Sequence, residues 1–369
     1  MIYLDYAASF PPYSETIAEC AAVAARAFAN PAAIHRAGSE ARSLLQRSRR
    51  TIASHLQVRP EEVFFTSCAT ESNNWAVTKG CIHPGRRHIV CSAIEHKSVL
   101  EAVAAMECNG YQVTYLRPDR FGRIDPTEAA RAIRPDTALL CVQAVNNETG
   151  VVQDVAALAA AAHEKGALYL CDGVQSFGHV PQPLHLADLI SLSAHKFGGP
   201  RGAGCLIIRQ PARLAPLLQG GGQEFGLRSG TENLPAIAGF AKAVEISAQR
   251  LPEESIRLAA LTAELETGLR ATCPDLLIAG EGTERSPGIL CCAFPGKSGE
   301  EMAIRLDLKG ICVSPGAACS SRDHKASHVL TAMGYSNEDA ARFLRISMGF
   351  ETTPEQIRET IGAITYIIK

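Results

Sequence analysis

The sequence predicts an α/β protein of two domains. The large domain has a mostly parallel seven-stranded sheet flanked by helices, and a smaller α+β domain lies towards the C-terminal end. Two observations predict this fold. Short apolar runs alternate with amphipathic helical stretches, which is the pattern of a parallel sheet with helices on both faces. The chain of 369 residues is also long for one compact core.

The strands of the large domain are expected where short runs of apolar residues occur, because a strand buried on both faces has no polar side. Seven such runs lie at residues 61–67, 87–93, 111–116, 137–145, 167–172, 188–194 and 202–208. Helical spacing predicts helices over 39–56, 127–133 and 155–166. Ligands of such sheets bind at the carboxyl ends of the strands, and the unusual polar clusters of this chain follow the apolar runs.

The connection between the domains is expected in a charged, amphipathic stretch over residues 242–269. Pro252 lies inside it and is expected to kink or break the helix, because proline lacks the N–H that the helix needs. Later elements are expected at 289–295 (strand), 311–314 (strand) and the start of 336–348 (helix). The predicted domains are residues 13–255, and residues 1–12 together with 256–369.

Composition and charge narrow the class of protein. The net charge of -2 shows no basic excess, so direct binding of nucleic acid is not expected. No run approaches the roughly 20 apolar residues of a membrane span, and the N-terminus lacks the pattern of a signal peptide. The 13 cysteines form no disulfide framework and no zinc-site spacing, so no metal is expected. A reducing cytoplasm is the expected location.

Several of the cysteines lie in apolar runs and are expected to behave as small buried hydrophobes: Cys91, Cys141, Cys171 and Cys205. Cys319 differs from them because its neighbours are small and polar, and because Arg322, His324 and Lys325 follow it. Nearby positive charge lowers the pKa of a thiol from about 8.5 and favours the nucleophilic thiolate. Cys319 is therefore a candidate nucleophile, although a cysteine in a loop is often incidental.

The strongest local signal for chemistry is a lysine that follows a predicted buried strand. Asp172 and Gln175 follow one strand, and Lys196 follows the next, before the glycines of 198–204. A lysine amine forms a Schiff base with an aldehyde cofactor, and pyridoxal 5′-phosphate (PLP) also needs a carboxylate on its ring nitrogen. Lys97 is a rival for this role, and a lysine on the surface without function is the usual alternative.

Two further segments could bind an anion. Residues 66–73 contain small hydroxyl side chains where a strand ends and a helix begins, which suits a phosphate group. A plain helix cap without a ligand is an equally good interpretation. Residues 220–233 are rich in glycine and contain Arg228 and Thr231, which is typical of an anion-binding loop; a flexible linker is the alternative.

Taken together, these segments resemble the cysteine desulfurases of the NifS/IscS type, which have the class V aminotransferase fold. The resemblance covers essentially the whole chain and rests on an ordered set of motifs: residues 3–8, 30–31, 69–73, 95–96, 146–148, 172–175, 193–196, 220–233, 318–320 and 345–347. The chain departs from the family pattern at Tyr6, Ser9, Cys68 and Phe225. The segment 320–328 also differs, which leaves the sulfur acceptor undetermined.

The resemblance implies a role for individual residues. Lys196 would hold PLP and move protons, and His96 would stack on the ring and act in acid–base steps. The remaining cofactor contacts would come from Asp172, Gln175, Asn147, Ala69, Thr70, Ser193 and His195. Thr231 would reach the phosphate of the other subunit of a homodimer. Asn30, Asn147 and Arg345 would bind the carboxylate of the substrate, a task that suits the arginine fork.

The resemblance also implies a reaction. L-cysteine would be converted to L-alanine, and its sulfur would stay on Cys319 as a persulfide, a reversible modification that can pass the sulfur onward. The acceptor would be an iron–sulfur scaffold, a tRNA- or cofactor-thiolating protein, or a rhodanese-like carrier. Three alternatives remain: a selenocysteine lyase, because residues 316–319 also resemble those enzymes; a class V aminotransferase without sulfur chemistry; and a catalytically silent assembly partner.

Overall fold

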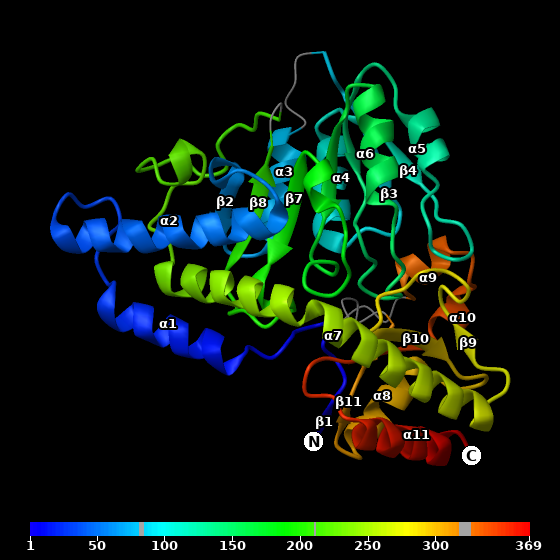
Figure 1. The fold of residues 1–369 in the computed structure, drawn as a ribbon. Coiled ribbons are helices and arrows are strands. Elements are labelled where there is room, and N and C mark those ends of the chain that lie inside the picture. The colour runs from blue at the N-terminus through cyan, green and yellow to red at the C-terminus, as the bar shows by residue number, and fades with distance from the viewer. Residues whose placement is uncertain (81–84, 210–211, 317–325) are drawn as a thin grey trace.

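A central sheet between two layers of helices forms the larger part of the protein (Figure 1). The computed structural model describes residues 1–80, 85–209, 212–316 and 326–369. In these residues, seven strands form one sheet in the order β2 (Val63–Thr66), β8 (Gly204–Ile208), β7 (Leu189–Ser193), β6 (Leu168–Asp172), β5 (Thr137–Cys141), β3 (His88–Ser92) and β4 (Gln112–Leu116). β8 runs antiparallel to both neighbours, and the other pairs are parallel. The predicted, mostly parallel seven-stranded sheet is confirmed, and each strand lies within a predicted run.

Side chains alternate between the two faces of the sheet, and a different set of helices covers each face. Ile89 and Cys91 of β3 point to one cluster of buried residues, and Val90 between them points to the other. One face is covered by α3 (Ala69–Gly80) and α4 (Lys97–Cys108). The other is covered by α2 (Arg36–Leu56), α5 (Pro126–Ala132), α6 (Val155–Glu164) and the first half of α7 (Leu234–Thr272). Helix α1 (Ser14–Arg26) packs against α7.

A third cluster of buried residues lies around two smaller sheets. One sheet has the order β12 (Ser314–Pro315), β13 (Phe343–Ser347), β10 (Ile289–Ala293) and β9 (Leu277–Ile278); the other pairs β1 (Ile2–Tyr3) with β11 (Ile311–Cys312). Helices α8 (Gly299–Asp307) and α11 (Pro354–Ile368) pack beside them, and α9 (His328–Ala332) and α10 (Asn337–Ala340) are short. This cluster joins Ile2 and Leu4 to residues from Leu258 onward, which supports the predicted grouping of the two chain ends. The domain boundary at residue 255 stays a prediction.

Two details of this region differ from the sequence-based expectations. Residues 311–314 do not form one strand, because β11 pairs with β1 while β12 pairs with β13 in another sheet. Pro252 does not break α7, which continues as one helix from Leu234 to Thr272; a kink at the proline stays a prediction. Buried side chains on both sides of the proline, such as Phe240 and Leu265, hold the two halves in place. Tertiary packing therefore overrides the local cost of the proline.

Within the described residues, no helix combines the length and the apolar character that crossing a membrane requires.

Candidate active site

A cavity of about 320 Å³ opens at the carboxyl ends of the parallel strands. This volume is at the lower end of the range of roughly 300–1,000 Å³ for small-molecule sites. The cavity is lined by ten of the residues singled out in the sequence: Ala69, Thr70, His96, Asn147, Asp172, Gln175, Ser193, His195, Lys196 and Arg345. The sheet topology brings them together, because β6 ends at Asp172 and the adjacent β7 ends at Ser193.

Lys196 is held at this site by the N-terminal segment of the chain. It ends a short 3-10 turn, Ala194–Lys196, that follows β7 directly. Its Nζ donates hydrogen bonds to the carbonyl oxygens of Ala7 at 2.8 Å and Ala8 at 3.0 Å. Lys97, the rival in the sequence, begins α4 and is not among the residues that line the cavity. The structure therefore favours Lys196 over Lys97 as the amine of this site.

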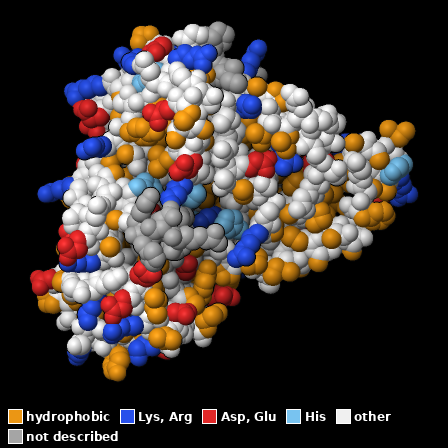
Figure 2. All heavy atoms as spheres, turned by 180° about the vertical axis from the view of Figure 1, so that it is seen from behind, with side chains coloured by type: hydrophobic (Ala, Val, Ile, Leu, Met, Phe, Trp, Pro, Cys, Tyr) orange, Lys and Arg blue, Asp and Glu red, His pale blue; other side chains and the backbone are white. Residues whose placement is uncertain are grey.

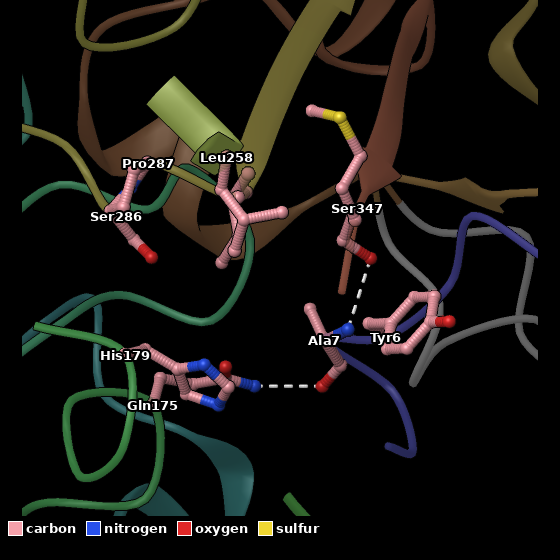
Figure 3. Close-up of a pocket in the computed structure, with 11 residues that line it drawn as sticks. Tyr6, Ala7, Gln175, His179, Leu258, Ser286, Pro287 and Ser347 are labelled. Atoms are coloured by element: carbon pink, nitrogen blue, oxygen red, sulfur yellow. Dashed lines mark hydrogen bonds between the residues drawn. The ribbon is translucent and has the colours of Figure 1, made fainter. Parts of the chain in front are cut away.

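Ala7 separates the large cavity from a smaller one of about 20 Å³, because Ala7 and Gln175 line both. Figure 3 shows residues that line this smaller cavity, with Ser347 on one side of Ala7 and Gln175 on the other. Ala7 accepts a hydrogen bond from Gln175 Nε2 at 2.7 Å, and its N–H donates to Ser347 Oγ at 2.9 Å (Figure 3). The carbonyl that contacts Lys196 is thus fixed by side chains of two other elements.

Asp172 is the buried carboxylate of the cavity. It is 7% exposed, and its Oδ1 accepts a hydrogen bond from the N–H of Val174 at 3.0 Å. Its Oδ2 accepts from Asn73 Nδ2 at 2.8 Å, and Asn73 is fully buried on α3. These two donors fix the plane of the Asp172 carboxyl group in the wall of the cavity.

The part of the cavity that is lined by Ala69, Thr70 and Ser193 is suited to an anion. Ala69 and Thr70 begin α3, and the first N–H groups of a 12-residue helix attract negative charge. The Oγ of Ser193 is buried and has no hydrogen-bond partner among the described residues. Buried hydroxyl groups are normally satisfied, so this unpaired Oγ is where a bound group would supply the missing partner.

His195 lies beside Ser193 and is held in its neutral form. Burial, and then the charges of Lys196 and Arg201, lower its pKa from 6.5 to about 4. Its Nδ1 is 3.4 Å from Ser9 Oγ. A bound anion would raise the pKa of His195 again, because a negative charge stabilises a protonated imidazole.

His96 is the N-cap of α4 and lines the cavity between Asp172 and Lys196. Its Nδ1 accepts a hydrogen bond from the N–H of Ser98 at 3.1 Å and lies 2.8 Å from Ser98 Oγ. Burial is the main cause of its lowered pKa; the charge of Asp172 opposes this effect, and the charges of Lys196, His328 and Lys97 add to it.

Arg345 supplies a buried cation to the cavity from β13. It is 4% exposed and donates to Asp5 Oδ1 and to the carbonyl oxygen of Asn147, both at 2.8 Å. Its Nε is buried and has no hydrogen-bond partner among the described residues. The guanidinium therefore has donor capacity left for an anionic ligand in the cavity.

Three sequence-predicted residues are not placed at this cavity. Asn30 is exposed in the connection between α1 and α2, where its Oδ1 accepts from the N–H of Ala32 at 2.9 Å. Thr231 is exposed and is not among the cavity residues. Cys319 lies outside the described residues, as do Arg322, His324 and Lys325.

In the loop over residues 220–233, Arg228 does not have the free guanidinium that the sequence suggested for an anion site. Arg228 forms an ion pair with Glu71 of α3 at 2.8 Å, so its guanidinium is engaged by a carboxylate of the same chain. Glu224 forms a buried ion pair with Arg49 and also accepts from the N–H of Phe65 at 2.8 Å. The loop is therefore anchored at two carboxylates, which also excludes a flexible linker.

Both described ends of the segment that contains Cys319 lie beside the cavity. At the first end, Ser314 is the strand partner of Arg345. At the second end, His328 Nε2 is 2.9 Å from the carbonyl oxygen of Glu95, the residue before His96. Ser327 Oγ donates to Glu148, the residue after Asn147.

Sequence reasoning missed residues that support the site without being reactive themselves. Ser98 and Asp5 contact His96 and Arg345 directly. The spacing of a cap residue and a serine two positions later could have indicated Ser98. Asp5 lies within a motif that the resemblance included, but its partner is 340 residues away in sequence. The predicted burial of Cys91, Cys141, Cys171 and Cys205 is confirmed, because each is 0% exposed.

Comparison with known proteins agrees with the fold. The family model described as "Aminotransferase class-V" matches residues 2–359. A solved structure titled "NIFS-LIKE PROTEIN" superposes with a TM-score of 0.93 at 34% identity and covers 100% of this chain and 99% of that one. The chain belongs to the class-V aminotransferase family.

Within that family, the similar proteins carry one recurrent description. "Cysteine desulfurase IscS" of Dictyoglomus turgidum is 36% identical over 373 residues, which cover 100% of this chain and 94% of the relative. The structure titled "SspA in complex with cysteine" superposes with a TM-score of 0.84 at 33% identity and covers 94% of this chain and 99% of that one.

Proposed function

We propose that this protein is a PLP-dependent cysteine desulfurase that converts L-cysteine to L-alanine and holds the sulfur as a persulfide on Cys319. One observation carries the proposal. The amine of Lys196, the carboxylate of Asp172 and the guanidinium of Arg345 meet in one cavity, and both described ends of the Cys319 segment lie beside it. The similarity to cysteine desulfurases and to a cysteine complex supports the same reaction.

The residues of the cavity fit PLP. Lys196 would hold its aldehyde carbon, Asp172 its ring nitrogen, and Gln175 and His96 the remainder of the ring. Ala69, Thr70, His195 and the unpaired Oγ of Ser193 would hold its phosphate. When bound, PLP supplies an electron sink that stabilises negative charge on the α carbon of an amino acid.

The protein groups then account for the remaining steps. Arg345 would bind the carboxylate of L-cysteine with Asn147 beside it, which orients the α carbon towards Lys196. The amine of Lys196 would take the α proton. The thiolate of Cys319 would attack the sulfur of the substrate, so that a sulfur–sulfur bond forms and the carbon–sulfur bond breaks. The electron pair of the broken bond would stay on the β carbon, which takes one proton, and the protonated amine of Lys196 would return a proton to the α carbon to give L-alanine.

Chain connectivity supports Cys319 as the sulfur carrier. Only three residue steps separate it from Gly316, which hydrogen-bonds to the carbonyl oxygen of Phe343 at 2.9 Å. Three residue steps span at most about 11 Å, a reach that supports the proposed role of Cys319 at this site.

The experiment that tests this function measures L-alanine and sulfide from L-cysteine for the wild type and for Cys319→Ala, with L-selenocysteine in parallel. We expect both products from the wild type, and loss of the cysteine reaction in the variant. Activity confined to selenocysteine would identify a selenocysteine lyase instead. Activity that survives the loss of Cys319 would contradict the persulfide. A purified protein without a PLP chromophore would favour the silent assembly partner.

We further propose a homodimer in which Thr231 completes the site of the other subunit. Two observations support it: Thr231 lies outside the cavity of its own chain, and the connection between α1 and α2 presents hydrophobic side chains to solvent. Phe28 and Ile34 of this connection are 83% and 99% exposed. Figure 2 shows hydrophobic side chains at the surface of the arm that projects to the right. Asn30 lies between them in sequence and is proposed to act at the same interface.

A mixture of two inactive variants tests the dimer. Lys196→Ala and Thr231→Ala would each be inactive or weak alone. After they are mixed and their subunits exchanged, the mixed dimer would contain one intact site, because Lys196 and Thr231 would come from different chains. Recovered activity supports the proposal. If subunits exchange and no activity returns, Thr231 does not act across the interface.

The onward route of the sulfur is proposed from the same resemblance. A protein scaffold for iron–sulfur clusters, a thiolation enzyme or a rhodanese-like carrier would take the persulfide sulfur from Cys319 in the cytoplasm. Incubation of radiolabelled persulfide enzyme with each class of acceptor would show which one gains the label.

A further inference from the structure

Two residues without an assigned role connect Asp172 to His96 through a continuous run of hydrogen bonds. Asn73 Nδ2 lies 2.8 Å from Asp172 Oδ2 and 2.9 Å from Ser98 Oγ. Ser98 Oγ lies 2.8 Å from His96 Nδ1, and the N–H of Ser98 donates to the same nitrogen at 3.1 Å. Asn73 is fully buried and Ser98 is 8% exposed, so water does not compete for these bonds.

The carboxylate of Asp172 fixes the direction of every bond in this run. A carboxylate only accepts, so the amide of Asn73 must present its NH₂ group to Asp172 and not its carbonyl oxygen. The same NH₂ group has a second hydrogen, which it donates to Ser98 Oγ. Ser98 Oγ already accepts there, so its own hydrogen is available for His96 Nδ1.

His96 Nδ1 therefore faces two donors, the hydroxyl and the backbone N–H of Ser98. A ring nitrogen that accepts hydrogen bonds has no proton, so neutral His96 must bear its proton on Nε2. No hydrogen bond between described residues ends on Nε2, and the ring lines the cavity. The position at the start of the 12-residue helix α4 also disfavours a charged imidazole.

We infer that Asn73 and Ser98 are positioning residues that hold His96 as the neutral Nε2–H form, a hydrogen-bond donor to the cavity and not an acid–base group. This inference rests on the proposed function, and it differs from the acid–base role that the family resemblance implied for His96. A neutral histidine with its proton on Nε2 has no lone pair to offer the cavity. Movement of protons then belongs to Lys196.

Burial and neighbouring charges act in the same direction as the hydrogen bonds. Burial lowers the pKa of His96, the charges of Lys196, His328 and Lys97 lower it further, and only Asp172 among the named groups raises it. A proton on Nδ1 would point at the two hydrogens that Ser98 donates to this nitrogen, so at least one of these hydrogen bonds would break.

The test uses the PLP-loaded and cofactor-free protein labelled with ¹⁵N-histidine. Two-bond ¹⁵N–¹H NMR correlations distinguish the two neutral tautomers and the charged ring. The signals of His96, one of 11 histidines, are identified by their loss in His96→Asn. We expect a pyrrole-like Nε2 and a pyridine-like Nδ1 at neutral pH. A protonated Nδ1 in the wild type would overturn the inference, whatever the enzyme does with cysteine.

A set of variants tests the contribution of Ser98. Ser98→Ala removes one donor to Nδ1, so the NMR titration midpoint of His96 should rise by up to about one pH unit, the equivalent of one neutral hydrogen bond. Ser98→Thr keeps the hydroxyl and should restore the midpoint. Ser247→Ala is the matched control, because its buried hydroxyl bonds to Ala243 within α7. An unchanged midpoint in Ser98→Ala, with a folded protein, would refute the role of Ser98.

Discussion

Burial sets the ionic state of the two histidines at the cavity. For both His195 and His96, the largest cause of the lowered pKa is the removal of the ring from water, and Lys196 adds to the effect. The cavity therefore contains two neutral imidazoles near a carboxylate, a guanidinium and an amine. Its positive charge therefore lies on Lys196 and Arg345 and not on the imidazole rings.

The lowered pKa of His195 predicts how stability depends on pH in the cofactor-free protein. Its pKa falls from 6.5 to about 4 on folding, so the unfolded state binds more protons between these values. The free energy of unfolding should therefore decrease as the pH falls from 6.5 towards 4. In His195→Asn this decrease should be smaller, as measured by urea unfolding at a series of pH values. Parallel curves for both proteins would show that His195 does not contribute.

The fork of Arg345 predicts a defect in substrate binding when its geometry is lost. Arg345→Lys keeps the charge but loses the paired N–H groups, so KM for L-cysteine should rise about 10- to 100-fold, as for loss of one hydrogen bond to a charged group. Arg257→Lys is a suitable control, because Arg257, like Arg345, donates to a backbone carbonyl (Thr352) and to a carboxylate (Glu254), but away from the cavity. A fall in kcat at unchanged KM would contradict this role.

Some residues of the site could be predicted from the sequence, because the proposed chemistry needs a particular side chain and that side chain follows a recognisable strand. Asp172 and Lys196 are of this kind, since each follows a buried apolar run. Asn73 could not be placed from the sequence, because its partners, Ser98 and Asp172, lie on other elements. Thr231 and Asn30 were named through the family resemblance, and a single chain does not bring them to its own cavity.

Among the elements, the N-terminal segment joins the reactive lysine to the buried cluster around the smaller sheets. Leu4 belongs to that cluster, while Ala7 and Ala8 contact Lys196. Tyr6 and Phe10, with Tyr13 and Ile246, form a small aromatic cluster beside it. The segment is thus held on both sides of the lysine contact by buried side chains.

A pair of glycines tests how tightly this segment is packed. A Cβ at Gly349 would lie 2.1 Å from Cδ1 of Tyr6, whereas a Cβ at Gly362 would meet nothing within 4 Å. Gly349→Ala should therefore lower the free energy of unfolding by about 1–3 kcal/mol through overpacking. Gly362→Ala, inside α11, should raise it by roughly 0.5–1 kcal/mol. Equal effects of the two changes in urea unfolding would contradict this packing.

The elements also show where sequence patterns are informative. All seven strands of the large sheet lie within predicted runs, because strands buried on both faces are continuously apolar. The direction of β8 was also accessible, since the few residues from Phe197 to Ala203 are too short for a parallel crossover, which needs about a dozen or more. The continuity of α7 through Pro252 was not accessible, because it depends on packing by distant residues.

At the scale of the whole molecule, two connections join the buried cluster on the α7 face of the large sheet to the buried cluster around the smaller sheets. Helix α7 contributes Phe240 to one cluster and Leu265 to the other. The ion pair between Asp5 and Arg345 joins the N-terminal segment to β13 at the cavity. These connections favour unfolding of both clusters in one transition.

The single tryptophan allows this cooperativity to be measured. Trp75 is fully buried on the α3 and α4 face of the large sheet, so its fluorescence reports on the large sheet and not on the cluster around the smaller sheets. Leu4→Ala removes a fully buried side chain from the other cluster and should cost about 2–5 kcal/mol. We expect the urea midpoint of Trp75 fluorescence to fall together with that of far-UV circular dichroism. A fluorescence midpoint unaffected by Leu4→Ala would show that the clusters unfold independently.

The ion pair between Asp5 and Arg345 has a consequence for the newly made chain. Its two partners are 340 residues apart, and β1 pairs with β11 beside it. On the ribosome, Lys196 and the strand before it are complete long before residue 345 is synthesised, so the amine exists while the arginine that binds the carboxylate does not. A nascent chain could thus meet an aldehyde before it can orient an amino acid, and its turnover must await the synthesis of Arg345.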